Sequence, residues 1–159
     1  MATLRAGLIL GTLVVAWSCV MGFTGWYHLP TLFALRWLAI PLQVAVLLVL
    51  LRIQAPRYGY LRQVANGVAA SVIASVLIFA GSLLFTTLLF PSYFREMEAL
   101  GRLKMAQQGL APDQIEALIR AQAPLQRPLP AAFAAVMVTW FTGLVTSLIG
   151  ATWFRKKLA

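Results

Sequence analysis

Apolar residues dominate four long stretches of the chain, and shorter segments between them carry most of the charges and prolines. The stretches cover residues 4–26, 32–51, 64–90 and 131–154. A helix rises about 1.5 Å per residue, so about 20 residues cross the hydrocarbon core of a bilayer. The pattern therefore predicts four transmembrane helices, and we expect residues 1–159 to form a single integral membrane domain.

The ends of these stretches carry residues that are typical of membrane boundaries. We expect Trp26 and Tyr27, at the end of the first stretch, to form an interfacial aromatic belt. Arg36 lies about one turn into the second stretch, near enough to the edge to extend its charge to the interface. Pro41 is expected to bend the second helix. The basic residues 155–157 end the fourth stretch as an interfacial anchor.

Segment 91–130 is polar and holds all four acidic residues of the chain. It predicts two short amphipathic helices, one over about 92–108 with Gly109 as its cap, and a second that begins at Pro112. Each helix has one apolar face, and we interpret these faces as the candidate surface for the membrane or a partner. The residues are Phe94, Met97 and Leu100 on the first helix and Ile115, Leu118 and Ile119 on the second.

The composition supports a membrane protein, since 61% of the residues are hydrophobic. Soluble domains contain about 45–50% apolar residues, and a chain this short has too little interior to hide such an excess. The net charge is +9, from 13 basic and 4 acidic residues. The bases stand at the ends of apolar runs and form no stripe between aromatic residues, so we expect no nucleic-acid partner. We interpret them as topology signals and as contacts to anionic lipid.

The distribution of basic residues predicts the orientation. Five of the 13 lie in segment 91–130, which leaves eight. Seven of these eight fall on one side of the membrane if the amino terminus is cytoplasmic: Arg5, Arg52, Arg57, Arg62, Arg155, Lys156 and Lys157. Short cytoplasmic loops carry an excess of Lys and Arg, so both termini are predicted to be cytoplasmic. The helical hairpin would then lie on the extracytoplasmic side, which is the periplasm in a bacterial cell.

Small and hydroxyl-bearing residues recur at helical spacing in the first, third and fourth stretches. Lipid tails are as apolar as leucine, so helices in a bilayer associate through close backbone approach and hydrogen bonds. We therefore expect these three stretches to form a tight core, with the second packed outside and more exposed to lipid. The residues that we assign to helix packing, or alternatively to the lining of a polar path, are Gly7, Gly11, Ser71, Ser75, Ser82, Thr86, Gly143, Ser147 and Gly150.

Residues for catalysis or metal binding are scarce. His28 is the single histidine, Cys19 the single cysteine, and no acidic residue lies in an apolar stretch. A catalytic triad or a metal site needs more such groups at suitable spacing. We therefore expect no enzyme and no cofactor. The lack of an acid within the spans also argues against proton-coupled transport.

A series of short motifs runs in order from the connector after the second stretch to the carboxyl end. They are Tyr58-Gly59-Tyr60, Gly67, Pro91-Ser92-Tyr93, Gln107-Gln108-Gly109, the segment from Pro112 to Glu116, Gly143, and Ser147-Leu148-Ile149 with Ala151. In this order and spacing the chain resembles the bacterial family catalogued as domain of unknown function 4199, which are small four-span inner-membrane proteins. The resemblance implies that fold and the inner (cytoplasmic) membrane as location, and it implies no activity or site residues.

The sequence thus predicts an all-α fold, a four-helix transmembrane bundle with an extracytoplasmic amphipathic hairpin between spans three and four. Our leading interpretation is a non-catalytic small membrane protein that acts through protein or lipid contacts. The alternative is a subunit of a homo-oligomeric channel or small-solute facilitator, with a path between copies lined by Ser71, Ser75, Ser82 and Thr86. The expected partners are the lipid bilayer and a second copy or another membrane protein.

Overall fold

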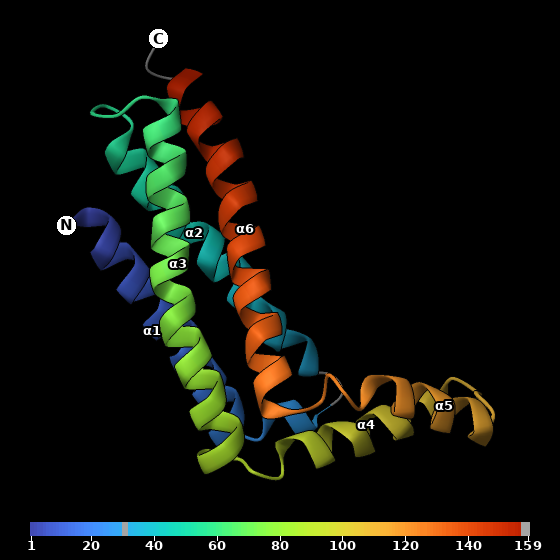
Figure 1. Cartoon of the computed structure of the whole chain (residues 1–159). Coiled ribbons are helices and arrows are strands. Elements are labelled where there is room, and N and C mark those ends of the chain that lie inside the picture. The colour runs from blue at the N-terminus through green and yellow to red at the C-terminus, as the bar shows by residue number, and fades with distance from the viewer. Residues whose placement is uncertain (30–31, 157–159) are drawn as a thin grey trace.

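A computed structural model describes residues 1–29 and 32–156 and confirms an all-helical fold without a strand in those ranges (Figure 1). Lys157, part of the expected basic anchor, lies outside the described residues. Two helices form a hairpin that projects from one end of the four-helix bundle. The bundle consists of α1 (Ala2–Phe23), α2 (Ala39–Gln54), α3 (Tyr60–Leu84) and α6 (Pro128–Lys156), and the hairpin of α4 (Tyr93–Gln107) and α5 (Pro112–Gln122).

Four helical segments are long and apolar enough to cross a membrane, as predicted: Ala2–Phe23, Ala34–Gln54, Tyr60–Leu89 and Pro128–Phe154. The second and third extend beyond their apolar stretches, so that Arg52 and Gln63 lie on helices. Backbone groups near a bilayer are best satisfied within a helix, and long polar side chains reach the interface from its last turn. The second helix therefore ends later than its apolar stretch, and the third begins earlier.

The second span changes its helix type just before Pro41. It begins as a 3-10 helix, η2 (Phe33–Leu38), and becomes α-helical at Ala39. Pro41 therefore lies in the first turn of α2, where backbone N–H groups lack α-helical partners and proline is tolerated. Proline here lies close to the start of the α-helix, and the bend expected at Pro41 stays a prediction.

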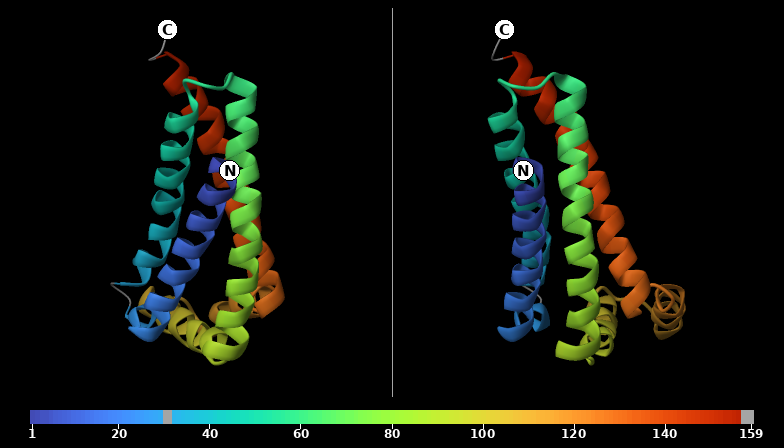
Figure 2. Two further views of the ribbon diagram at one scale, coloured as in Figure 1. Left: turned by 90° about the vertical axis from the view of Figure 1, so that its left-hand side faces the viewer. Right: turned by 60° about the vertical axis from the view of Figure 1, so that its left-hand side comes forward.

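The helices are not arranged around the bundle in sequence order. α3 packs between α1 and α6, and α2 packs against α1 and α6 to close the bundle (Figure 2). Gly7 faces Ala70, and Gly11 faces Ala74, so α1 and α3 run in the same direction. Helices that are not consecutive in the chain, such as α1 and α3, are therefore neighbours in the bundle.

Glycine and serine residues interlock where α3 and α6 cross. Gly67 faces Ser147, and four residues further along α3, Ser71 faces Gly143. A methyl group at Gly67 would lie 2.9 Å from Cβ of Ser147, and one at Gly143 would lie 2.6 Å from Cβ of Ser71. Each glycine thus makes room for a serine of the other helix, and the two backbones approach closely.

The second span is more exposed than the other three, as expected, but part of it belongs to the core. α2 has the smallest buried share of the four spans, 22% against 33% for each of the others, yet Leu47 and Leu51 are fully buried. A methyl group at Gly150 of α6 would lie 2.8 Å from Cδ1 of Leu51, so the glycine provides the space that this leucine fills. Gln43 adds a hydrogen bond from its side-chain amide to the carbonyl of Thr139, at 2.7 Å.

A chain of polar side chains joins three helices at the end of the bundle away from the hairpin. The Asn66 amide donates to the Gln54 side-chain oxygen at 2.9 Å, and the Gln54 amide donates to the Thr3 hydroxyl at 3.3 Å. These residues come from α3, α2 and α1. They hold this end together through groups that can also meet water at a membrane surface.

The contact between Gly67 and Ser147 predicts that a second substitution can compensate for the first. Gly67→Ala should destabilise the bundle by about 1–3 kcal/mol, because the new methyl group overpacks the crossing. Adding Ser147→Gly removes the atoms that the methyl group meets, together with a hydroxyl that makes no hydrogen bond, and should restore most of the loss. Unfolding in mixed micelles measures both changes.

Gly59→Ala is the matched control, since no atom lies within 4 Å of a methyl group there. If Gly67→Ala is no more destabilising than Gly59→Ala, or if Ser147→Gly gives no rescue, the crossing is not as tight as described.

Candidate functional site

An aromatic cluster joins α1, α3 and α4 at the hairpin end. Neighbouring ring centroids lie 4.7 to 6.3 Å apart. The end of α3 widens here into a π-helical turn, η3 (Phe85–Leu89), in which the N–H of Phe90 donates to the carbonyl of Phe85 at 2.8 Å. The wider turn brings these rings together. The cluster consists of Phe23, Tyr27, Phe85, Phe90, Tyr93 and Phe94.

Tyr27 connects the bundle to the hairpin and is not the membrane-belt residue that its position suggested. The side chain is only 6% exposed, and its hydroxyl donates to Oε2 of Glu96 at 2.7 Å. The Ser92 hydroxyl donates to the other oxygen of Glu96 at 2.6 Å. Burial, followed by the hydrogen bond to Glu96, raises the pKa of the Tyr27 phenol. The expectation was wrong because the folded hairpin covers this ring.

Arg36 lies beside the cluster on η2. The indole N–H of Trp17 donates to the carbonyl of Leu35 at 3.1 Å and so fixes η2 against α1. The Arg36 guanidinium lies 4.8 Å from the centre of the Trp37 ring. Burial raises the pKa of the Tyr93 phenol, and the positive charge of Arg36 opposes that rise.

Two cavities meet at this cluster. The inner cavity, of about 320 Å³, is lined by residues from all four bundle helices. The outer cavity, of about 300 Å³, lies between the bundle end and the hairpin. They share wall residues Tyr27, Arg36, Tyr93 and Phe94. Each is about as large as the smallest typical ligand pockets, which begin at about 300 Å³.

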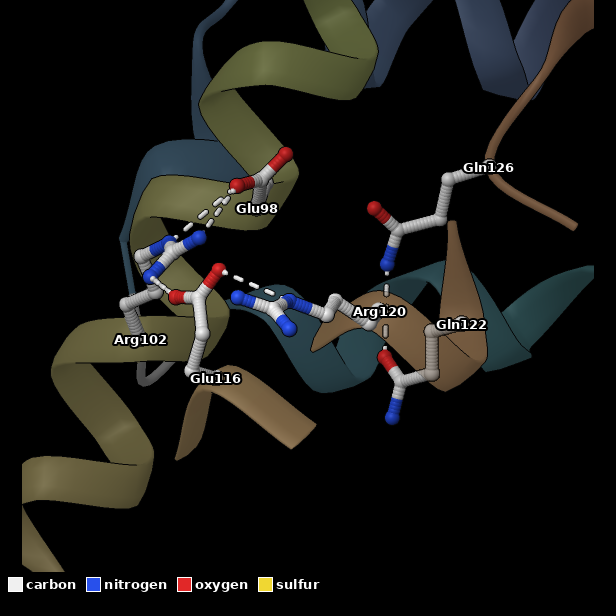
Figure 3. Close-up of polar contacts among 6 residues, drawn as sticks. All are labelled: Glu98, Arg102, Glu116, Arg120, Gln122 and Gln126. Atoms are coloured by element: carbon white, nitrogen blue, oxygen red, sulfur yellow. Dashed lines mark hydrogen bonds and ion pairs between the residues drawn. The ribbon is translucent and has the colours of Figure 1, made fainter. Parts of the chain in front are cut away.

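Arg102 holds the two hairpin helices together (Figure 3). Its guanidinium donates to Oε1 of Glu98 on its own helix at 2.9 and 3.1 Å, and to Oε2 of Glu116 on α5 at 2.7 Å. Arg120 lies 3.6 Å from the other oxygen of Glu116. The hydrogen bond from Arg102 lowers the pKa of the Glu116 carboxyl. These groups are largely exposed, so they align α4 and α5 more than they stabilise them.

The predicted apolar faces of the hairpin are partly covered by the molecule itself. Ile115 and Ile119 are buried, and Ile119 packs toward Gly101 of α4. Phe94, Met97 and Leu100 line the outer cavity, whereas Leu118 is 42% exposed. Ile115 and Ile119 therefore close the hairpin, while the half-buried face of α4 and the exposed Leu118 stay a predicted surface for the membrane or a partner.

The hydroxyl stripe of the third span also lies inside the protomer. Ser71, Ser75 and Thr86 are buried, and each hydroxyl donates to a carbonyl of its own helix. Ser75 also accepts a hydrogen bond from the indole of Trp140, at 2.9 Å. Ser82 and Thr86 line the inner cavity. A path between copies needs exposed hydroxyls, so this stripe gives such a path no support.

Several residues of the site were not assigned to it from the sequence. The sequence predicts Tyr27 as a ring of the membrane interface and gives Glu96 and Lys104 no particular role. Their contacts join positions far apart in the chain, such as Tyr27 and Glu96, 69 residues apart. An aromatic ring with a polar tip at the end of a span is a weak local signal for such a contact.

The fold and cavities define a small four-span membrane protein with a helical hairpin between the third and fourth spans. The chain belongs to the family described as protein of unknown function (DUF4199), whose model matches residues 5–156. This match confirms the resemblance seen in the sequence motifs. No curated protein and no solved structure matches the chain.

The raised pKa of Tyr27 predicts a loss of stability in alkali. The folded pKa lies above the unfolded value of 10.0, so the folded protein holds the proton more tightly. The resulting stability is complete below pH 10 and is lost as the pH rises above it. Tyr27→Phe should flatten this decline, which thermal unfolding from neutral pH to above pH 10 measures.

Burial raises the pKa of the Tyr93 phenol as well, so part of the decline in stability with pH should remain in the Tyr27→Phe variant. Tyr60→Phe, at the start of α3, is the control. If stability declines equally steeply with pH in the wild type and in Tyr27→Phe, the decline does not come from the Tyr27 phenol.

Proposed function

We propose that the protein is a non-catalytic, four-span protein of the bacterial inner membrane that holds an amphiphilic molecule from the membrane at its hairpin end. The observation that carries this proposal is the pair of cavities that share a wall of four residues. The inner cavity lies among membrane-spanning helices, and the outer cavity lies beneath the polar hairpin. An amphiphile has the same division into an apolar part and a polar part.

The acidic side chains support a non-catalytic role. Glu98 and Glu116 bind Arg102, and Glu96 accepts hydrogen bonds from Tyr27 and Ser92. Carboxylates engaged in this way orient helices and are poorly placed to exchange protons with a substrate. These contacts support a role in which the acidic side chains position the hairpin helices and take no part in catalysis.

Lipid retention tests the proposal. The wild-type protein, extracted gently from a bacterial membrane, should carry a bound amphiphile in its native mass spectrum. Ala131→Trp places a large ring at the wall of the inner cavity and should abolish that mass increment, whereas Ala134→Trp, at an exposed position one turn along α6, should keep it. Ala39→Phe is a second substitution in the same cavity wall, for use if Ala131→Trp unfolds the bundle.

A wild-type protein without a bound amphiphile would contradict the proposed function. So would equal retention by Ala131→Trp and Ala134→Trp. The same spectrum reports association with a second copy or another membrane protein, which stays a prediction from the sequence.

The proposed orientation places both termini in the cytoplasm and the hairpin outside it. Seven of the eight basic residues beyond segment 91–130 support it through the positive-inside rule. In a Cys19→Ser background, an impermeant thiol reagent should label Gln108→Cys in intact spheroplasts. It should label Gly59→Cys, in the opposite connector, after lysis. The reverse order of labelling would overturn the orientation.

A further inference from the structure

We infer that an anionic phospholipid binds at the end of the bundle away from the hairpin. One of its acyl chains lies in a groove between α1 and α2, and its phosphate lies beside arginine side chains at the end of that groove. This site is separate from the cavities at the hairpin end, and it does not rest on the ligand that we propose for them.

The groove between α1 and α2 has a volume of about 500 Å³, and its walls are apolar apart from Arg5. Ile9, Val49 and Ile53 on these walls are each more than half exposed. Both helices are long and apolar enough to cross a membrane, so these side chains meet hydrocarbon in a bilayer. The groove therefore suits an acyl chain that enters it from the surrounding lipid.

The contacts of α1 and α2 with other helices explain why the groove is present. α1 packs on α3 through Gly7, and α2 packs on α6, where Gly150 makes room for Leu51. Between α1 and α2 the short side chains of Ala6 and Ala45 line the groove. A larger side chain would fill this space, so the depth of the groove depends on these alanines.

A polar cavity of about 230 Å³ adjoins the groove, and the two share the wall residues Ala2 and Ile53. The cavity lies between the start of α1 and the connector from α2 to α3, and Figure 2 shows α1 beginning below that connector. Thr3, Gln54 and Asn66 line it, and the hydrogen bonds that join them fix this wall. A head group is thus best satisfied in the polar cavity and an acyl chain in the groove.

Positive charge surrounds the place where the groove and the polar cavity meet. Among the described residues that line them, the charged side chains are Arg5, Arg57 and Arg62, and all are cationic. All four acidic residues of the chain belong to segment 91–130, at the opposite end of the bundle (Figure 1). The acidic side chains are therefore too far away to neutralise these arginines, and an anion from the membrane complements them.

Arginine is well suited to bind the phosphate of a lipid. Its planar guanidinium can donate two parallel hydrogen bonds to phosphate oxygens. The Arg62 guanidinium lies 4.8 Å from the centre of the Tyr58 ring. That contact involves no acceptor oxygen, so the N–H groups can still donate to a phosphate. Basic pockets beside membrane-spanning helices bind anionic head groups in this way.

Two phospholipids with the same acyl chains but different head-group charge test the inference. The full-length protein is titrated in neutral detergent with phosphatidylglycerol or phosphatidylcholine, and bound lipid is counted by native mass spectrometry. An arginine beside an anionic head group strengthens binding about fivefold, so the three should favour phosphatidylglycerol by roughly twenty- to a hundredfold. Arg57→Gln and Arg62→Gln should each reduce this preference about fivefold for the same reason.

Arg52→Gln is the matched control, because it removes the same charge from an exposed position of α2 that lines neither the groove nor the polar cavity. If Arg52→Gln reduces the preference as much as Arg57→Gln does, the lipid responds to the charge of this end in general, and the assigned site is wrong. Equal binding of the two phospholipids by the wild type contradicts the inference as well.

Filling the groove tests the position of the acyl chain. Ala45→Trp places a large ring at the groove wall and should remove most of the bound phosphatidylglycerol. Ala69→Trp, at an exposed position of α3 that lines neither the groove nor the polar cavity, should retain it. Equal retention by the two variants would rule out the groove. The arginine variants test the site independently if Ala45→Trp fails to fold.

The outcomes distinguish this site from the one at the hairpin end. Ala131→Trp alters the inner cavity, so the lipid in the groove should stay bound in that variant. Lipid that is lost only in Ala45→Trp belongs to the groove, and an amphiphile that is lost only in Ala131→Trp belongs to the hairpin end. If oleate binds more tightly than phosphatidylglycerol and is lost in Ala45→Trp, the occupant is a single-chain carboxylate and the inference of a phospholipid is wrong.

Discussion

The close approach of α3 to its neighbours is the constraint on which the bundle depends. Lipid supplies little hydrophobic force between helices, so contact has to come from surfaces that fit at short distance. Gly67 and Gly143 make room for Ser147 and Ser71 on one side of α3, while Gly7 and Gly11 of α1 make room for Ile73 and Leu77 on the other. α2 is then held by leucines against the remaining faces of α1 and α6, which closes the bundle.

The hairpin end is built from large residues and from long-range polar contacts. Aromatic rings replace the glycine–serine crossing, and the cavities lie among and beside them. Tyr27, Ser92 and Glu96 fix the start of the hairpin to the bundle, and Arg102 fixes its second helix to the first. The hairpin end thus differs from the crossing of α3 and α6, where small residues allow the two backbones to approach closely.

The hairpin illustrates why an apolar face is ambiguous in a sequence. Ile115 and Ile119 look like a docking surface when α5 is considered alone, but they are buried once α4 lies beside it. Phe94, Met97 and Leu100 are likewise used as cavity walls. Periodicity indicates that such a face needs a cover, and it does not indicate whether the cover is lipid, a partner or the same chain.

The sequence by itself determined the features that depend on local composition and spacing. These are the four apolar spans, the two hairpin helices and the cap at Gly109, whose φ of 80° suits glycine. The tertiary structure alone decided which helices are neighbours, that α2 belongs to the core, and that Tyr27 binds Glu96. Apolar periodicity sets which residues enter a bilayer, but contacts between helices depend on how side chains from distant parts of the chain fit together, and no single segment contains that information.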